Sequence, residues 1–465
     1  MSESLPNDRM NLARLFCQRF TSAPPRWHIA APGRINLIGE HTDYNGFPVM
    51  PMALSQAIYI VAAPAEGHMV TLTNAQPDRY PDREFEVALE IPPYPQGDWG
   101  NYPKAAVQSL ARLWHGRGTD PGALRGMRCL VSGTLVPASG LSSSSALLIA
   151  SALSFAACNG CSELFRDDRA RYELAERMAQ AEHYVGTQGG GMDQAVCLLA
   201  REGSALRIDF FPLRAQPHAV PADFVAVAAH STVWVPKAYQ QRLAYNRRVL
   251  ECAIGKDILA RRLRRPEAQR LGDLCTAENH PGLLRLIGEL TRILQGRESL
   301  SIAEAAALLE VSPQDFAHTH LRMKDGSILP VPPDGLKPLP RCRHVLREAA
   351  RVSDAARCLA GGDMAALGRL MNESHRSCAD DYEISGPELD ELVRIMQDAG
   401  AAGARLTGAG FGGFAIALVQ SRHADALRQR LASEFYAPRG LRADGNVFTF
   451  TPARGARVDE LQDGP

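Results

Sequence analysis

The spacing of apolar residues changes along the chain between the two periods that distinguish strands from helices. In the first half, short apolar or alternating runs predict strands, and apolar residues three or four positions apart predict longer helices. The predicted strands cover 70–73, 84–89 and 127–136, and the predicted helices cover 99–113, 142–158 and 168–185. Strands and helices are therefore mixed in this half, and no stretch repeats another.

The second half begins with a predicted strand over 224–229 and continues with mainly helical spacing. Helices are predicted over 237–263, 343–359, 364–375 and 387–399, and strands over 404–406 and 414–419. Several prolines interrupt this pattern between 325 and 340, where we expect a surface loop. The pattern as a whole predicts an α+β fold with segregated elements.

The length of the chain indicates more than one domain. At 465 residues it exceeds the usual size of a single hydrophobic core. We expect an N-terminal domain over 1–215, a C-terminal domain over 216–455 and a disordered tail over 456–465.

The composition limits the classes of molecule that we expect this protein to bind. Lys+Arg and Asp+Glu both number 51, which argues against a nucleic acid or an anionic membrane as the main partner. The N-terminus lacks the pattern of a secretory signal, no run of 18 apolar residues occurs, and the ten cysteines form no disulfide or zinc framework. We therefore expect a cytoplasmic protein, monomeric, whose partners are small molecules.

The densest group of polar residues is the segment GRINLIGEHTDY, from Gly33 to Tyr44. Its polar side chains are poor material for a core, because each must find a hydrogen-bonding partner when buried. They suit a site that binds a small, hydroxyl-rich molecule, since carboxylates accept hydrogen bonds and an imidazole can accept or donate. The polar members are Arg34, Asn36, Glu40, His41 and Asp43.

A second motif, PASGLSSSSALLIASAL, begins at Pro137 and runs into a strongly helical segment. Gly140 permits unusual backbone angles, and the start of the following helix offers unpaired N–H groups and the positive end of its dipole. Such a helix start binds phosphates well. The alternative is an ordinary serine cap in front of a core helix.

A third motif, LTGAGFGGFAIALV, contains four glycines within six positions. Gly408, Gly410 and Gly413 match the dinucleotide-binding pattern GxGxxG, but that pattern requires a helix directly afterwards. Here a strand-like run follows, and a helix begins only near His423. We therefore predict a tight turn between two strands, with its backbone close to a ligand or to the other domain.

Two acidic residues are candidates for the chemistry. Asp193 follows Gly189–Gly191, and three consecutive glycines suggest that the backbone passes close to a bound molecule. Glu182 lies at the border of the apolar face of a predicted helix. The alternatives are that Asp193 caps the segment after it and that Glu182 is merely solvated.

The three motifs, in this order and at these separations, resemble the signature motifs of the GHMP small-molecule kinases. The first is specifically similar to the galactokinase signature, and the match continues at 99–104, 181–183, 189–194, 245–248 and 377–390. The resemblance implies a ribosomal-S5-domain-2-like N-terminal domain and a ferredoxin-like C-terminal domain, with the active site between them. It also implies ATP-dependent phosphorylation of the anomeric hydroxyl of a galactose-type sugar.

The resemblance further implies roles for individual residues. Asp193 would be the catalytic partner of the C1 hydroxyl, as a base or as an orienting acceptor, and Arg34 would stabilise charge beside it. Sugar contacts would come from Arg34, Glu40, His41, Thr42, Asp43, Gly190, Asp193 and Tyr245. ATP contacts would come from Trp99, Tyr102, Ala138, Ser139, Gly140, Leu141, Ser142, Ser143 and Ser144. Mg²⁺ would be held by Ser144 and Glu182.

Two alternatives remain open on the sequence. The GGGMDQ segment and the long serine run are also similar to N-acetylgalactosamine kinases, so the substituent at C2 of the sugar is not fixed. A non-catalytic galactose sensor is the other alternative. The retention of Ser144, Ser145 and Ala146 together with Asp193 and Arg34 favours an enzyme.

Overall fold

The computed structural model describes residues 9–21, 24–136, 140–186, 190–233, 238–275, 280–322 and 328–461. Its largest sheet has six strands in the order β12-β1-β2-β5-β3-β4. These are β1 (Trp27–Ile38), β2 (Met50–Pro64), β3 (Met69–Asn74), β4 (Arg83–Glu86), β5 (Met127–Gly133) and β12 (Arg457–Glu460). Neighbouring strands are antiparallel except β3 and β5, which are parallel.

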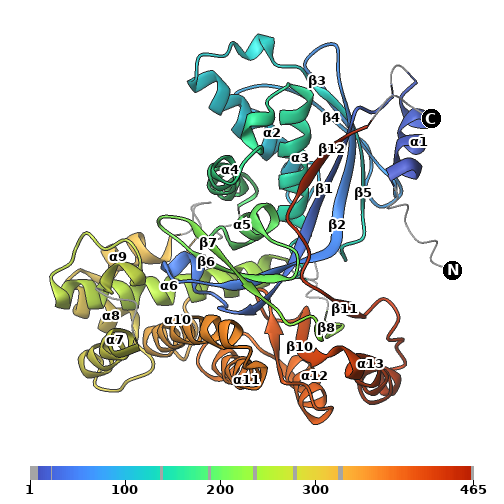
Figure 1. Cartoon of the computed structure of the whole chain (residues 1–465). Helices are drawn as coiled ribbons and strands as arrows, with labels where there is room; N and C mark the ends of the chain where they lie inside the picture. Colours follow the sequence, from blue (N-terminus) through green and yellow to red (C-terminus); the bar gives the residue numbers. More distant parts are fainter. Residues whose placement is uncertain are drawn as a thin grey trace.

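Helices cover both faces of this sheet. The alternation of side chains along β2 explains how. Ile60 and Ala62 belong to the large core that contains the apolar helix α3 (Ser143–Cys158), whereas Val61 and Ala63 pack with α1 (Arg9–Arg19) on the opposite face. The α3 face also carries α2 (Asn101–Gly116), α4 (Asp168–Ala181) and α5 (Met192–Leu199) (Figure 1).

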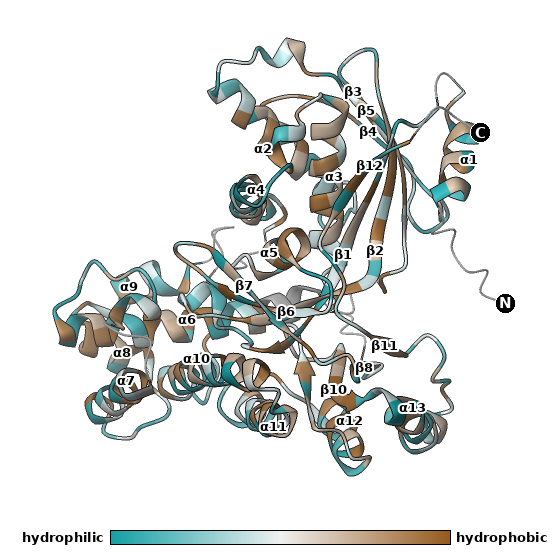
Figure 2. Cartoon of the chain, in the orientation of Figure 1, coloured by the Kyte–Doolittle hydropathy of each residue, from teal (hydrophilic) through white to brown (hydrophobic). Residues whose placement is uncertain are grey.

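A second, four-stranded antiparallel sheet has the order β11-β8-β10-β9. Its strands are β8 (Phe224–His230), β9 (Gly403–Thr407), β10 (Phe414–Gln420) and β11 (Val447–Phe450). It packs against α11 (Met364–Asp380), α12 (Pro387–Asp398) and α13 (Ala424–Leu431). Figure 2 shows hydrophobic residues along β10 and hydrophilic ones on α13, as expected for an inner strand and an outer helix.

The remaining elements lie between and beside the two sheets. A hairpin formed by β6 (Ser204–Asp209) and β7 (Arg214–Ala219) spans the expected domain boundary. A helical layer follows, made of α6 (Ala238–Leu263), α7 (His280–Ile293), α8 (Ile302–Leu309), α9 (Pro313–Phe316) and α10 (Pro338–Gly361). The end of β1 reaches this half of the molecule, where the strand contacts α10, α11 and β9 (Figure 1).

The predicted strands and helices are present with small shifts of their ends, but two expectations were wrong. The disordered tail expected over 456–465 is wrong for residues 457–460. These residues form β12 and pair with Trp27 to Ala30 of β1. Residues 462–465 lie outside the described part. The expected loop over 325–340 ends early, because Pro338 and Pro340 form the first turn of α10, where proline needs no N–H partner.

The predicted helix over 168–185 is α-helical only to Ala181 and continues as a short 3₁₀ turn, Glu182–Val185. No helix in the described ranges is long and apolar enough to cross a membrane.

Candidate active site

The first motif forms the end of β1 and the turn after it, and it is buried. Arg34, Asn36, Glu40, His41 and Asp43 are all less than 10% exposed. The expectation that these polar residues are unsuited to a core was therefore wrong. Some of their hydrogen-bonding partners lie in the distant C-terminal half, at residues 405–409, and the others lie within the N-terminal half. Such partners are what makes the burial of polar groups possible.

Arg34 and Asp193 form a bidentate ion pair, although 159 residues separate them. Nε of Arg34 lies 2.7 Å from Oδ1 of Asp193, and Nη2 lies 2.9 Å from Oδ2. The guanidinium also donates from Nη1 to the carbonyl oxygen of Gly140. This fork geometry fixes the orientation of the carboxylate at the first turn of α5. Asp193 thus has a charged partner and does not serve as the side-chain cap of that helix.

The phosphate-loop motif leads directly to the same carboxylate. Gly140 and Ser142 have φ angles of 84° and 59°, as an unusual loop conformation in front of α3 requires. The Ser142 hydroxyl makes no capping bond to α3 and instead donates to Oδ2 of Asp193, a contact that the sequence did not suggest. Leu141 accepts a hydrogen bond from the backbone N–H of Arg34. Ala138 and Ser139, two predicted ATP contacts, lie outside the described residues.

Asp43 lies against the glycine segment before α5. Its Oδ2 accepts a hydrogen bond from the backbone N–H of Gly190 at 3.1 Å. A Cβ atom on Gly190 would lie 2.4 Å from Cγ of Asp43, so only glycine fits there. Burial raises the pKa of Asp43 to about 6, and the nearby carboxylate of Asp193 acts in the same direction. The structure therefore brings three predicted sugar contacts, Asp43, Gly190 and Asp193, into one place.

Hydrogen bonds on both ring nitrogens determine the tautomer of His41. Nε2 faces the carbonyl oxygen of Ala409 at 3.2 Å, and a carbonyl can only accept, so Nε2 carries the proton. Nδ1 then accepts from the Tyr44 hydroxyl at 2.9 Å, and the oxygen of Tyr44 accepts from Tyr382 at 2.8 Å. Burial lowers the pKa of His41 to about 3, so the ring is neutral. Tyr245, a predicted sugar contact, packs its ring 5.3 Å from that of His41.

Thr42 does not fit its predicted role as a sugar contact. Its side chain is fully buried, and its hydroxyl oxygen lies 3.0 and 2.8 Å from the carbonyl oxygens of Gly39 and Pro48, which compete for its proton. A hydroxyl has only one proton to donate. The structure therefore assigns Thr42 to holding the turn.

Glu182 lies beside the start of α3 and is only 8% exposed. It accepts hydrogen bonds from Ser145 at 3.1 Å and from the side-chain amide of Gln194. Ser144, the predicted second ligand, lies near the Tyr102 hydroxyl, because consecutive residues of a helix point about 100° apart. Burial raises the pKa of Glu182 to about 7, with the Asp193 carboxylate acting in the same direction.

The Glu182 carboxylate suits a cation that is bound by few protein ligands. Among the described residues, no group of three or more His, Cys, Asp or Glu side chains could hold a metal. Mg²⁺ is typically bound by one or two carboxylates while phosphates and waters complete its shell. Glu182, hydrogen-bonded to Ser145 at the start of α3, fits that pattern.

Two aromatic residues, one just before α2 and one in its first turn, were predicted to contact the nucleotide. Tyr102 lies beside Ser144 of the phosphate loop. Trp99 donates from its indole to the carbonyl oxygen of Pro81 and meets Tyr80 edge to face, with ring centroids 6.3 Å apart. Tyr102 therefore lies next to the phosphate loop, whereas Trp99 lies against Tyr80 and Pro81.

The third motif is the predicted turn between two strands, because β9 and β10 are antiparallel neighbours. It lies at the phosphate loop, since a Cβ atom on Gly408 would be 3.2 Å from the carbonyl oxygen of Gly140. The backbone N–H of Gly408 donates to Oε1 of Glu40 at 2.9 Å. All three motifs therefore meet at one site.

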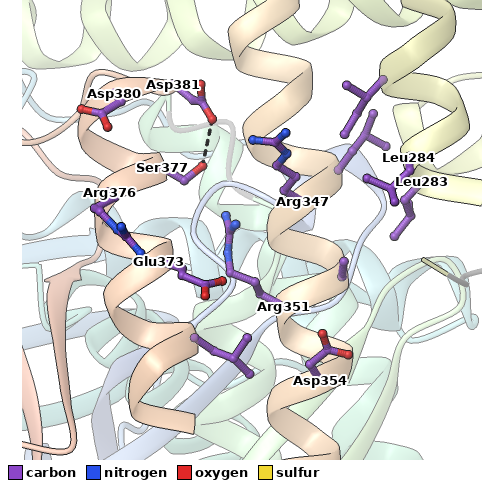
Figure 3. A pocket seen from close by; sticks show the side chains of 14 residues that line it. Leu283, Leu284, Arg347, Arg351, Asp354, Glu373, Arg376, Ser377, Asp380 and Asp381 are labelled. Carbon is purple, nitrogen blue, oxygen red and sulfur yellow. Dashed lines mark hydrogen bonds between the residues drawn. The ribbon is translucent and has the colours of Figure 1, made fainter. Parts of the chain in front are cut away.

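A cavity of about 550 Å³ lies apart from these residues, between α7, α10 and α11 (Figure 3). Leu283 and Leu284 line one side, and charged residues of α10 and α11 line the other. Figure 3 shows the Glu373 carboxylate directed toward Arg351. None of the predicted site residues that the structure describes lines this cavity.

Three family models match consecutive parts of the chain. They are the galactokinase galactose-binding signature at residues 14–64, the GHMP kinases N terminal domain at 101–201 and the GHMP kinases C terminal model at 354–437. The matched regions contain the three motifs described above. Both halves of the predicted GHMP kinase fold are thus confirmed.

Individual relatives agree over nearly the whole length. Galactokinase from Dictyostelium discoideum is 30% identical over 96% of this chain and 93% of its own. Galactokinase from Haemophilus influenzae (strain PittGG) is 30% identical over 93% and 95%. The crystal structure of Lactococcus lactis galactokinase complexed with galactose matches with a TM-score of 0.70 and 27% identity, covering 96% of this chain and 98% of that one.

The fold extends to more distant enzymes. A mevalonate kinase structure matches with a TM-score of 0.52 at 16% identity and shows the fold alone. The match to the curated relatives covers the ion pair, the phosphate loop and the buried signature turn, and it shows that this chain belongs to the galactokinase family.

Proposed function

We propose that this enzyme transfers the γ-phosphoryl group of ATP to the C1 hydroxyl of galactose, giving galactose 1-phosphate and ADP. The observation that carries the proposal is the bidentate pair of Arg34 and Asp193, with 2.7 and 2.9 Å contacts, at the meeting point of the three motifs. Phosphoryl transfer requires two reactants in line and charge neutralised around them, and it needs little covalent chemistry from the protein.

In this mechanism Asp193 accepts the hydrogen bond of the C1 hydroxyl. The C1 oxygen forms its bond to the γ-phosphorus while the bond to the β-phosphate oxygen breaks, and the hydroxyl proton leaves toward Asp193. Arg34 and Ser142 hold the carboxylate in place through both of its oxygens. The guanidinium can also stabilise the negative charge that develops on the transferred group.

The sugar is proposed to lie against the signature turn. Asp43, Gly190 and Tyr245 lie close to one another around His41 and Asp193 and can bind its hydroxyls. Glu40 can accept from a hydroxyl through Oε2, which receives only the Asn36 amide in the described residues. The His41 ring can donate from Nε2, because the 3.2 Å bond to Ala409 is its weaker one.

ATP is proposed to lie over the start of α3. Residues Gly140 to Ser144 surround the phosphates with backbone N–H groups and hydroxyls, and Trp99 lines the adenine site. Glu182 and a hydroxyl of Ser144 or Ser145 would hold Mg²⁺. When bound, that ion supplies positive charge to the phosphate oxygens. We also propose that the enzyme works in the cytoplasm.

The test is the activity of Asp193→Asn, measured as galactose-dependent ADP release. We expect the variant to fold and to lose turnover by about 10³-fold or more, since an amide cannot take the proton. Asp209→Asn is the matched control, because Asp209 also pairs with an arginine, Arg207, and its side chain is 29% exposed against 24% for Asp193. Near-normal activity of Asp193→Asn would refute the mechanism.

A panel of sugars tests the substrate. Galactose, N-acetylgalactosamine, 2-deoxygalactose and arabinose should be compared by kcat/KM with wild-type protein. Galactose should give the highest value, as the galactose-binding signature at 14–64 favours it. A higher kcat/KM for N-acetylgalactosamine would change the assigned sugar without affecting the role of Asp193.

A further inference from the structure

A closed group of buried charges surrounds the backbone of the signature turn. Two carboxylates, Glu40 and Glu348, and two guanidiniums, Arg351 and Arg405, lie within it, and each residue is at most 8% exposed. Formal charge therefore balances inside the group. Burying such charges is costly unless each is paired, so their geometry is tightly constrained.

Arg405, on β9, is the centre of this group. Its Nη1 donates to Oε1 of Glu40 at 3.0 Å and to the carbonyl oxygen of Asn36 at 3.2 Å, and Nη2 lies 3.9 Å from Glu348. Burial by itself lowers the pKa of Arg405, but the surrounding carboxylates outweigh it and keep the side chain charged. One side chain from the second sheet thus holds both the backbone and the side chain of the signature segment.

Glu348, on α10, holds the opposite side of the turn. Its Oε1 accepts the backbone N–H of Gly39 at 2.8 Å, and its Oε2 accepts Nε of Arg351 at 2.7 Å. Burial raises the pKa of Glu348, yet Arg351 and Arg405 lower it to about 2, so it is ionised at neutral pH. Gly39 has a φ of 103°, so this bond fixes a glycine conformation directly before Glu40.

These contacts determine which carboxylate oxygen of Glu40 can accept a further hydrogen bond. Oε1 already accepts from Arg405 and from the N–H of Gly408, which fills its two lone pairs. Among the residues that the structure describes, only Asn36 donates to Oε2, which leaves one lone pair of that oxygen. Oε2 is therefore the oxygen of Glu40 that can accept a hydrogen bond from a ligand.

We propose that Arg405 is a positioning residue for the sugar: it holds Oε1 of Glu40 so that Oε2 faces a sugar hydroxyl. Glu348 supports the same arrangement by fixing Gly39. The inference rests on the proposed sugar contact of Glu40. It adds a role for two residues of the C-terminal half, neither of which touches the sugar.

The test is a comparison of Michaelis constants in Arg405→Lys and wild type. Lysine keeps the charge, but its ammonium is a compact donor that cannot span Glu40 and the Asn36 carbonyl as a planar guanidinium does. We expect KM for galactose to rise about tenfold or more, while KM for ATP and kcat change less than about threefold. Wild-type activity on galactose, measured in the same assay, tests the proposed function separately.

Arg341→Lys is the matched control. Arg341 is equally buried and pairs with Glu251 at 2.7 Å, but its partners are on α6 and at 381–383 and not in the signature segment. It should lose thermal stability comparably and keep KM for galactose. Two results would overturn the inference. One is an unchanged KM for galactose in Arg405→Lys. The other is a rise of KM for galactose and KM for ATP that is equal in Arg405→Lys and in the control.

A second variant covers the case in which Arg405→Lys does not fold. Glu348→Gln keeps an oxygen for the Gly39 N–H and removes only the charge. Galactose binding to this variant, measured by calorimetry without ATP, should weaken about threefold or more. Wild-type affinity in Glu348→Gln would also overturn the inference.

Discussion

Gly190→Ala is the sharpest perturbation of the candidate site, because it adds one carbon directly against Asp43, in the segment that leads to Asp193. The new Cβ atom would lie 2.4 Å from Cγ of Asp43 and 2.5 Å from the backbone nitrogen of Tyr44. Ordinary contact begins near 3.4 Å, so the separation from Asp43 must grow by 1.0 Å, the difference between 3.4 and 2.4. Neither neighbour is the end of a flexible side chain, since Asp43 is itself held by Gly190 and by the turn.

A displacement of this size affects both sides of the reaction. Either Asp43 moves away from the sugar, or the segment before α5 moves and carries Asp193 with it. A 1 Å misplacement of reacting groups can cost about 100-fold in rate. We therefore expect kcat/KM for galactose to fall by about 100-fold in Gly190→Ala, with the thermal unfolding midpoint lowered only modestly.

The assay is galactose-dependent ADP release over a range of galactose concentrations at saturating ATP. Gly288→Ala is the control, because Gly288 is exposed on α7 and a Cβ there meets nothing within 4 Å. That variant should keep its activity and gain up to about 1 kcal/mol, the helix propensity of alanine over glycine. A kcat/KM within threefold of wild type in Gly190→Ala would refute the packing argument.

Three further predictions concern the loop, the turn and the end of the chain. Ser142→Ala and Ser142→Gly both remove the hydroxyl that bonds Asp193 and should lower kcat by about 10- to 100-fold. Since φ is 59°, glycine relieves the strain that a Cβ causes there, so Ser142→Gly should be about 1 kcal/mol more stable than Ser142→Ala in urea unfolding, and equal stabilities of the two variants would contradict the strain. The raised pKa of Asp43, about 6 against an unfolded value of 3.8, means that its protonated form adds stability below pH 4 and that this contribution is lost as the pH rises through 6. Asp43→Asn, which stays neutral, should therefore gain stability relative to wild type between pH 4 and pH 8 in urea titrations, and a constant difference would show that burial does not shift this group. Deleting residues 457–465 removes β12 from the edge of β1 and should lower the thermal unfolding midpoint, by loss of a few kcal/mol of pairing, whereas an unchanged midpoint would mean that the strand adds nothing.

Local patterns predicted many of the helices and strands, but not the two longest strands, β1 and β2. Helix α3 follows from an uninterrupted run of strong helix formers, and the β9–β10 turn follows from glycines placed between two apolar runs. Strand β12 was missed because three of its four residues are charged, so the segment carries no apolar pattern of its own. Its strand conformation depends on the free edge of β1, which is far away in the sequence.

The sequence by itself determined the inventory of the site: a polar signature, a serine-rich helix start, a glycine turn, and the acids Asp193 and Glu182. Only the tertiary structure decided the partners. Glu40 meets Arg405 across 365 residues, and that contact turned a segment that looked unfit for a core into a buried one. The physical reason is that periodicity reports the local face of a residue, whereas the cost of burying a charge depends on which distant group neutralises it.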